Sequence, residues 1–319
     1  MKELMFLNPV LKECIWGGTR LSGFGYRLPS DKTGECWGIS AHRNGDCTVA
    51  SGAYAGMTLS DLFTKHRELF GGIGGEYFPL LVKIIDAKND LSVQVHPDDE
   101  YARIHENGAS GKAECWYILD CDEGAAIVLG HRAKDRKEAE EMIREGRFSD
   151  FIREIPIQKG DFLMIEPGVI HAIKGGTMLL ETQENSDITY RVYDYGRLVN
   201  GAPRKLHIEE SLAVMKCPCL PDKPDSKTER VGRSEIRHFV SDSHFSTTLY
   251  RVDGELAVTN GNPFSAVTVL SGSGAVDGTP VKKGDNFLIP AGYGDFVLSG
   301  RMELMLSTVP KEPKVAIQE

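Results

Sequence analysis

The sequence predicts a mainly β protein with a few short peripheral helices. Its 319 residues include 34 glycines and 15 prolines, which are spread along the chain and favour many turns between short strands. Within residues 155–171, strand patterns alternate with a Gly-Asp turn and a Pro-Gly turn, and this spacing indicates a β-sandwich or barrel. Gly284–Gly292 repeats the pattern of Gly160–Gly168 with a one-residue shift, which predicts two copies of one barrel.

The chain is long enough for two domains. Residues 216–234 are rich in Pro, Lys, Asp and Ser and lack periodicity, so we interpret them as a linker. We expect a catalytic domain over residues 1–225 and a smaller C-terminal β domain over residues 226–319. The second copy has Gly294 or Asp295 where the first has a histidine, and residues 246–319 contain none, so we expect no metal ligands there.

The charge and composition exclude several classes of function. A formal net charge of −9 argues against a nucleic-acid-binding protein and against a polybasic membrane surface. An anionic substrate must therefore be held by a local cluster of Lys and Arg. Apolar residues make up 41% of the chain and charged residues 26%, which is typical of a globular protein with an ample core.

The cysteines and the apolar patterning predict a cytoplasmic protein. Seven cysteines are an odd number, and Cys217-Pro218-Cys219 has the spacing of neither a zinc knuckle nor a redox motif, so we expect free thiols. The apolar N-terminal run is broken by Asn8 and Pro9, which does not fit a signal peptide. No apolar stretch approaches the roughly 20 residues that a membrane helix needs.

Periodicity predicts the individual elements. Helices are expected from Thr58, from Pro97 to about His105 and within residues 134–147, the last with a solvated charged face. Strands are expected near residues 35–40, 78–86, 91–96, 112–119, 155–171, 178–182 and 189–193. The strand at 78–86 is apolar throughout except for Lys83, and a lysine in such a run requires a partner.

Residues 91–96 present three polar side chains on one strand face. Alternation places Leu91, Val93 and Val95 on the apolar face, and Ser92, Gln94 and His96 on the other. Gln94 and His96, two apart, are typical of two metal-directed side chains aimed at one point. A satisfied polar pair is the commoner explanation of such a pattern, and both remain open here.

The Gly-Asp turn, the Pro-Gly turn and the histidine that follows resemble the second motif of the cupin barrel. The resemblance implies two cupin-type barrels or jelly rolls, with a metal held by Gln94, His96, Glu114 and His171. One carboxylate among neutral ligands leaves a divalent ion positively charged, as in a catalytic site. The alternative is four unrelated polar residues around a barrel mouth.

Four ordered motifs resemble those of type I mannose-6-phosphate isomerases: Leu91–Asp98, Lys112–Tyr117, Glu166–Ala172 and Ser186–Arg197. The resemblance implies one Zn²⁺ per chain, with other divalent metals possible, and interconversion of mannose 6-phosphate and fructose 6-phosphate through a cis-enediol. About 57 residues separate Glu114 from His171, so the chain is similar to the short bacterial form of the family.

The same resemblance implies roles for the cationic residues. Arg191 matches the catalytic arginine, and its planar fork suits an oxyanion or a phosphate; the alternative is a strand-surface salt bridge. Lys83 and Lys112 match lysines of the active site. Burial lowers the pKa of a lysine, so either could shuttle a proton. Lys83 could instead be a buried lysine paired with a carboxylate, and Lys112 a phosphate contact.

Glu181 and Asp187 are the carboxylates near Arg191 in the sequence. We expect one to act as general base and the other to orient Arg191. Ser92 is expected to bind substrate together with Lys112 and Arg191. The other seven histidines are interpreted as ordinary polar residues: His42, His66, His105, His131, His207, His238 and His244.

Three other functions remain open. A non-catalytic phosphosugar-binding cupin, acting as sensor or scaffold, would not need so many proton-handling groups beside the metal. An iron oxygenase is disfavoured by the Gln ligand. An isomerase of a different phosphosugar is possible, because pocket contacts decide between epimers. The expected partner is a small phosphosugar, with neither nucleic acid nor membrane, and the expected state is a monomer or homodimer.

Overall fold

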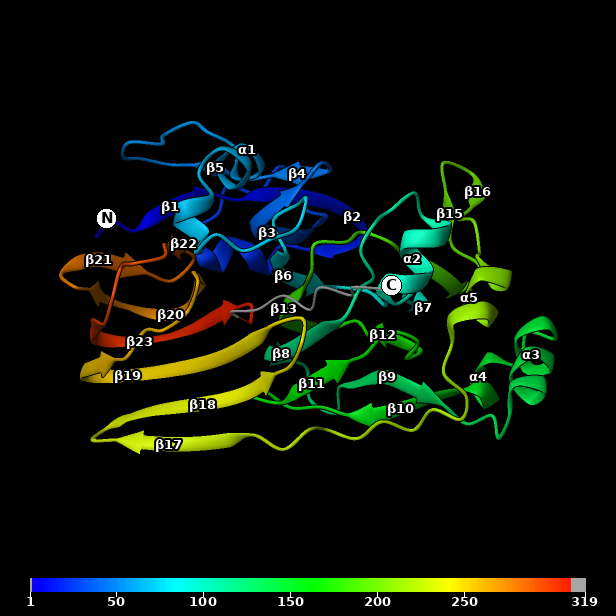
Figure 1. The fold of residues 1–319 in the computed structure, drawn as a ribbon. Helices are drawn as coiled ribbons and strands as arrows, with labels where there is room; N and C mark the ends of the chain where they lie inside the picture. The colour runs from blue at the N-terminus through cyan, green and yellow to red at the C-terminus, as the bar shows by residue number, and fades with distance from the viewer. Residues whose placement is uncertain (1, 311–319) are drawn as a thin grey trace.

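The computed structural model describes residues 2–310 and is mainly β (Figure 1). The strands of the first two-thirds of the chain are β1 Met5–Asn8, β2 Val10–Gly18, β3 Thr33–His42, β4 Gly45–Asp46, β5 Thr48–Val49, β6 Leu80–Ala87, β7 Val93–Val95, β8 Glu114–Cys121, β9 Ala126–His131, β10 Ile152–Pro156, β11 Phe162–Ile165, β12 His171–Ile173, β13 Thr177–Glu184, β14 Tyr190–Tyr193, β15 Leu198–Val199 and β16 Ala202–Pro203.

The remaining strands and the helices complete the chain. The strands are β17 Lys227–Val231, β18 Ser234–Ser241, β19 Ser246–Val258, β20 Ser265–Val276, β21 Thr279–Lys282, β22 Asn286–Ile289 and β23 Phe296–Thr308. The helices are α1 Leu59–Lys65, α2 Asp99–His105, α3 Arg136–Arg144, α4 Phe148–Phe151 and α5 Ile208–Val214, with short 3-10 turns at Arg20–Phe24 and Arg67–Phe70.

Two antiparallel sheets face each other and enclose the first core. One has the order β11-β8-β13-β6-β2-β3-β4 and the other β10-β9-β12-β7-β14. Their inner faces meet in one cluster, in which Trp116 of β8 and Leu179 of β13 pack with Ile127 of β9 and Ile173 of β12. Alternation along each strand directs these apolar side chains inward. This half, on the right of Figure 1, carries all the helices from α2 onward.

The third sheet combines the two ends of the described chain. Its order is β17-β18-β19-β23-β20-β22-β1-β5, with β21 paired to β20, and we call it the C-terminal sheet. Met5 of β1 pairs with Leu288 of β22. The N-terminal strand thus belongs to the C-terminal sheet, which a division of the chain after residue 225 does not anticipate. That division stays a prediction.

The internal repeat has the same local structure in both copies. Gly160 and Gly284 have φ values of 89° and 93°, which favour glycine. The Asp161 carboxylate accepts a hydrogen bond from the backbone N–H three residues before it at 2.9 Å, and Asp285 does the same at 2.8 Å. Each turn leads into a strand, β11 or β22, so the prediction of a duplicated unit is confirmed.

Most predicted elements are present, but the linker is only partly correct. Helices α1, α2 and α3 begin after Thr58, Asp98 and Asp135, whose side chains accept hydrogen bonds from the first turn. The prediction of an irregular linker over 216–234 is wrong for β17, which pairs with β18. Every residue of β17 is exposed, so its sequence has no alternation to reveal a strand.

The two halves share an apolar contact and carry free thiols. The ring of Phe264 lies 5.6 Å from that of Phe70 and 5.3 Å from that of Phe78, measured between centroids. Thr182 of β13 and Ser307 of β23 are hydrogen-bonded at 3.0 Å. All seven cysteines are free, as predicted. Within residues 2–310, no helix has both the length and the apolar composition to span a membrane.

Candidate active site

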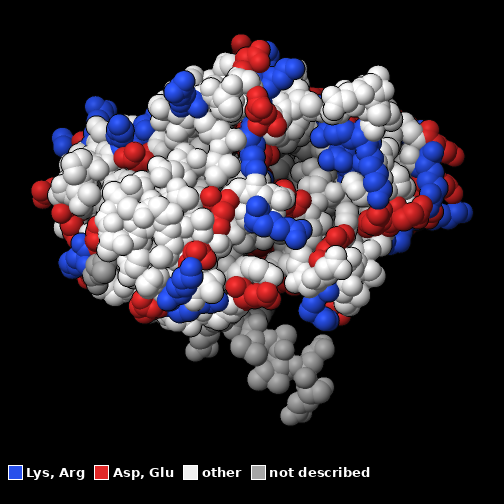
Figure 2. Space-filling model, turned by 90° about the horizontal axis from the view of Figure 1, so that it is seen from above, with Lys and Arg blue, Asp and Glu red and all other residues white. Residues whose placement is uncertain are grey.

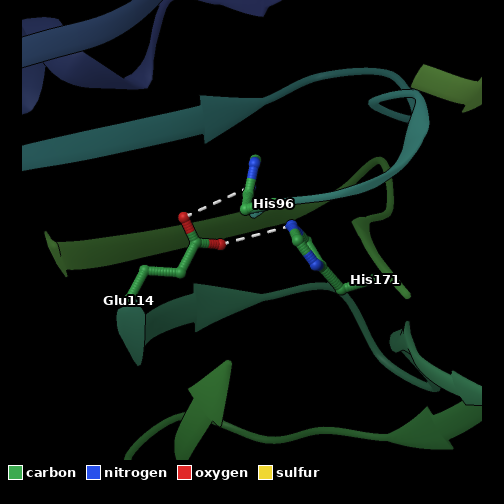
Figure 3. A group of neighbouring side chains, drawn as sticks. All are labelled: His96, Glu114 and His171. Atoms are coloured by element: carbon green, nitrogen blue, oxygen red, sulfur yellow. Dashed lines mark ion pairs between the residues drawn. The ribbon is translucent and has the colours of Figure 1, made fainter. Parts of the chain in front are cut away.

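Strands of the two facing sheets bring the predicted metal ligands together. Gln94 lies on β7, His96 directly follows it, and His171 begins β12 opposite Gln94 in the antiparallel register. Glu114 begins β8 on the facing sheet. Its Oε1 lies 3.3 Å from Nε2 of His171 and its Oε2 lies 3.6 Å from Nε2 of His96 (Figure 3). All three side chains are buried, and their ligand atoms lie within 4.8 Å of one another.

The hydrogen bonds fix which atoms carry lone pairs at this point. Nδ1 of His171 lies 2.9 Å from the Val169 carbonyl oxygen, which can only accept, so Nδ1 holds the proton and Nε2 presents a lone pair. Nε2 of His96 lies 3.1 Å from the Lys112 ammonium and therefore accepts. Neither oxygen of Glu114 accepts a well-aligned hydrogen bond from the described residues. These converging lone pairs in a buried site fit a divalent cation.

The protonation states of the two histidines agree with metal binding. Burial lowers the pKa of His171 to about 3, and it also lowers the pKa of His96 well below its usual range, with Lys112 adding to the effect. Burial raises the pKa of the Glu114 carboxyl, and Glu181 adds to the rise. Both imidazoles are thus neutral near pH 7, as ligands must be.

The fourth predicted ligand, Gln94, also faces this cluster. The end of its amide lies 3.3 Å from Nε2 of His171. A half-turn of the amide exchanges its nitrogen and oxygen, so the same side chain could offer an oxygen to a cation. The structure thus brings Gln94 together with the three buried residues.

Lys112 lies against the cluster. Its Nζ is 2.6 Å from Oε2 of Glu114, and its side chain is only 5% exposed. Lys112 stands in an irregular segment two residues before Glu114, so the same short stretch supplies a carboxylate and an ammonium group to one point.

Lys83 has the partner that its apolar strand required. Its Nζ lies 2.8 Å from Oε1 of Glu181, its register partner on β13, and Trp116 donates its indole N–H to the other oxygen of Glu181 at 2.8 Å. Burial opposes the charging of Lys83, but Glu181 and Glu35 outweigh it and raise its pKa. Burial would raise the pKa of Glu181, yet Lys83 and Lys112 hold it below its usual value. The expectation that burial lowers the pKa of Lys83 is therefore wrong.

Arg191 lies on β14, beside the strand that carries Gln94. Its Nε donates to Oγ of buried Ser92 at 3.3 Å and its Nη1 to the Lys205 carbonyl at 2.9 Å. It forms no ion pair within the described chain, so the expectation that Glu181 or Asp187 orients it is wrong. Asp187 is exposed and accepts a hydrogen bond from the Asn44 side chain at 3.0 Å. These two groups have different partners although they are close in sequence.

A second arginine group near Arg191 was not predicted. Nε of Arg197 and Nε of Arg204 donate to Asp194 at 3.1 and 2.7 Å. Burial would raise the pKa of Asp194, but these two arginines hold it below its usual value. Arg197 lies in the motif that suggested Arg191, whereas no local sequence pattern identifies Arg204. Figure 2 shows Lys and Arg side chains gathered beside a hollow on one face of the molecule.

The fold and site together define a cupin with one buried two-histidine, one-glutamate metal-binding candidate. Residues 4–129 match the family described as phosphomannose isomerase type I, catalytic domain, and residues 235–309 match the mannose-6-phosphate isomerase cupin domain. The chain is 44% identical to Mannose-6-phosphate isomerase ManA of Bacillus subtilis over 310 residues, covering 96% of this chain and 98% of the relative.

Two further comparisons agree with this match. Identity to a mannose-6-phosphate isomerase of Streptococcus mutans is 41% over 316 residues, covering 96% of this chain and 98% of the relative. The crystal structure of a Bacillus subtilis mannose 6-phosphate isomerase superposes with a TM-score of 0.94 at 45% identity, covering 96% and 99% of the two chains. The chain belongs to the type I phosphomannose isomerases, which are metal-dependent aldose–ketose isomerases.

Proposed function

We propose that the chain interconverts D-mannose 6-phosphate and D-fructose 6-phosphate at the cluster of His96, Glu114 and His171. The observation that carries this proposal is the convergence of three buried ligand atoms next to the charged pair of Lys83 and Glu181. Within the apolar barrel, such an arrangement can stabilise charge that develops on a bound sugar.

The reaction moves one hydrogen between two neighbouring carbons. A base removes the proton from C2 of the aldose, the C1 carbonyl becomes a hydroxyl, and a proton returned to C1 with loss of the O2 proton gives the ketose. Atoms and electrons balance without an external oxidant. A bound divalent ion, which we propose is one Zn²⁺ held by Gln94, His96, Glu114 and His171, would supply a Lewis-acidic positive charge.

The chain's own cations would hold the substrate. We assign Lys112, whose Nζ lies 2.6 Å from Oε2 of Glu114, the role of binding a sugar oxygen beside the metal ligands. We assign Lys83 the role of a fixed buried cation, because Glu181 keeps it charged. Arg191 is half-exposed on β14, and its Nε donates a hydrogen bond to Ser92. Its planar guanidinium suits the phosphate or an oxyanion of the substrate.

The choice of base follows from the ion pair that Glu181 forms and from the exposure of the other carboxylate. Glu181 is held below its usual pKa by Lys83, which makes it a weak base near neutral pH. Asp187 is the other carboxylate that the sequence suggested, and it is exposed with an amide partner. We therefore propose Asp187 as the candidate base and Glu181 as the residue that orients Lys83.

Metal removal tests the proposed function directly. The purified protein is treated with a chelator and assayed for conversion of mannose 6-phosphate before and after addition of Zn²⁺. We expect activity to disappear and to return with zinc in a ratio of one ion per chain. A protein that binds the phosphosugar but does not convert it with any divalent metal would instead be a phosphosugar-binding cupin. The cytoplasmic location and a monomeric or homodimeric state remain predictions.

A further inference from the structure

The segment that carries Lys112 has no secondary structure of its own. Residues 109–113 lie between α2 and β8. The Lys112 N–H donates to the Pro97 carbonyl at 3.0 Å, and side chains of neighbouring elements hold the residues on either side. The Gly111 N–H donates to Oδ1 of Asp99 at 2.8 Å, and the Ala113 N–H donates to Oε2 of Glu184 at 2.7 Å. The carboxylates of Asp99 and Glu184 thus accept hydrogen bonds from the backbone on either side of Lys112.

The two carboxylates lie close together. One oxygen of Asp99 and one of Glu184 are within 4.8 Å of each other and of a His244 ring nitrogen. Like charges at this distance repel, and the partial burial of Glu184, whose side chain is 12% exposed, strengthens the repulsion. A cation between them would remove this cost.

His244, which comes from the C-terminal sheet, places an imidazole beside these two carboxylates. It lies in the loop between β18 and β19, and its Nδ1 is 3.2 Å from Oε1 of Glu184. The loop is fixed, because Oδ1 of Asp242 accepts the N–H groups of His244 and Phe245 at 2.7 and 3.1 Å, and the Phe245 ring is fully buried. The hydrogen bond with Glu184 raises the pKa of His244, with Asp242 and Asp99 adding to the rise and burial opposing it.

We propose that His244 is a positioning residue of the isomerase, which acts through Glu184 and Asp99 to fix the segment that presents Lys112 and Glu114 to the substrate. This inference rests on the proposed function for its kinetic consequence. It gives the C-terminal sheet a part in the active site. Its structural core is testable without activity.

The test compares three single variants. His244→Ala removes the ring, His244→Gln keeps a neutral donor, and Glu184→Gln keeps an acceptor for Ala113 without the negative charge. His238→Ala is the matched control, because His238 is an exposed histidine of the same sheet with one hydrogen bond to Thr248 at 3.0 Å. Hydrogen–deuterium exchange is followed at the Gly111 and Ala113 amides, in chelator-treated and in zinc-loaded protein.

The expected results separate positioning from a structural role. In His244→Ala, the Gly111 and Ala113 amides should exchange about tenfold faster or more, while amides of β20 and β23 stay protected. The kcat for mannose 6-phosphate should fall about tenfold with a smaller change in KM and unchanged zinc content, and His244→Gln should recover part of the loss. Adding Glu184→Gln to His244→Ala should cause little further change, because both act on one contact.

Other results would overturn the proposal. Exchange at Gly111 and Ala113 that matches His238→Ala would remove the positioning role, as would faster exchange spread over the whole C-terminal sheet with unaltered kcat. If His244→Ala does not fold, His244→Gln and Glu184→Gln decide through the same two amides. Wild-type protein inactive on mannose 6-phosphate would refute the proposed function, whereas the exchange data would still decide the role of His244.

Discussion

Nζ of Lys83 lies 2.8 Å from Oε1 of Glu181, and the two side chains are only 7% and 3% exposed. The two residues are register partners on β6 and β13, so the sheet itself sets their approach. Trp116, opposite Glu181 on β8, occupies the second carboxylate oxygen. A buried pair of this kind holds both groups charged, because neutralising either one leaves the other without compensation.

Substituting one member of this ion pair should lower the free energy of unfolding, because the other member stays buried without a partner. We expect Lys83→Met alone or Glu181→Leu alone to lower the free energy of unfolding by about 3–5 kcal/mol, since each leaves a charged group buried without its partner. The double variant Lys83→Met/Glu181→Leu should lose less than the sum of the single variants. Urea unfolding of the metal-loaded proteins measures this, and additive losses would show that the two groups are not coupled.

Substituting a predicted metal ligand and substituting Arg191 should have different effects on zinc binding. His171→Ala should weaken zinc binding by more than about 100-fold, beyond the range for an outer partner, and abolish activity with it. Metal content is measured after dialysis by elemental analysis. Arg191→Ala is the matched comparison, because its guanidinium bonds to Ser92 and to a backbone carbonyl and should leave zinc in place while turnover falls. Full zinc occupancy in His171→Ala would exclude it from the ligand set.

The Asp194 arginine group predicts an acid-sensitive contribution to stability. The pKa of Asp194 in the folded chain lies below the ordinary value of an aspartate, so its stabilising effect is present above that ordinary value and disappears as the pH falls through the folded value. The difference in unfolding free energy between wild type and Asp194→Asn should therefore be largest near neutral pH. It should stay constant from about pH 7 to about pH 5 and shrink on acidification from about pH 5 to about pH 3. A difference that is constant over this range would contradict the assignment of charge pairing.

Gly111 leaves no room for a side chain. A Cβ at this position would lie 2.5 Å from backbone atoms of both Asp98 and Asp99. Gly111→Ala should therefore displace the segment that carries Lys112, lower stability by about 1–3 kcal/mol and reduce kcat. Gly23→Ala is the control, because a Cβ there would meet only the end of the Lys283 side chain at 3.9 Å. Thermal unfolding and kinetics of both variants check this, and equal behaviour would show that the close approach is tolerated.

The sequence by itself determined where the candidate metal ligands and the repeated unit lie in the chain. Gln94 and His96 are two apart on one strand, and His171 follows a turn whose glycine and proline mark it without tertiary context. Each signal is local, because a strand's period of two and a turn's φ preference act within a few residues. The exposed strand β17 escaped prediction for the same reason, since no buried face imposed a pattern on it.

Only the tertiary structure decided which charged groups meet. The register of β6 with β13 places Lys83 opposite Glu181, and the packing of the β18–β19 loop places His244 beside Glu184. Asp187 and Arg191 are close in sequence but have different partners, and β1 joins the C-terminal sheet. Such contacts depend on how distant strands pair to bury their apolar faces, and no pattern within a single segment encodes that pairing.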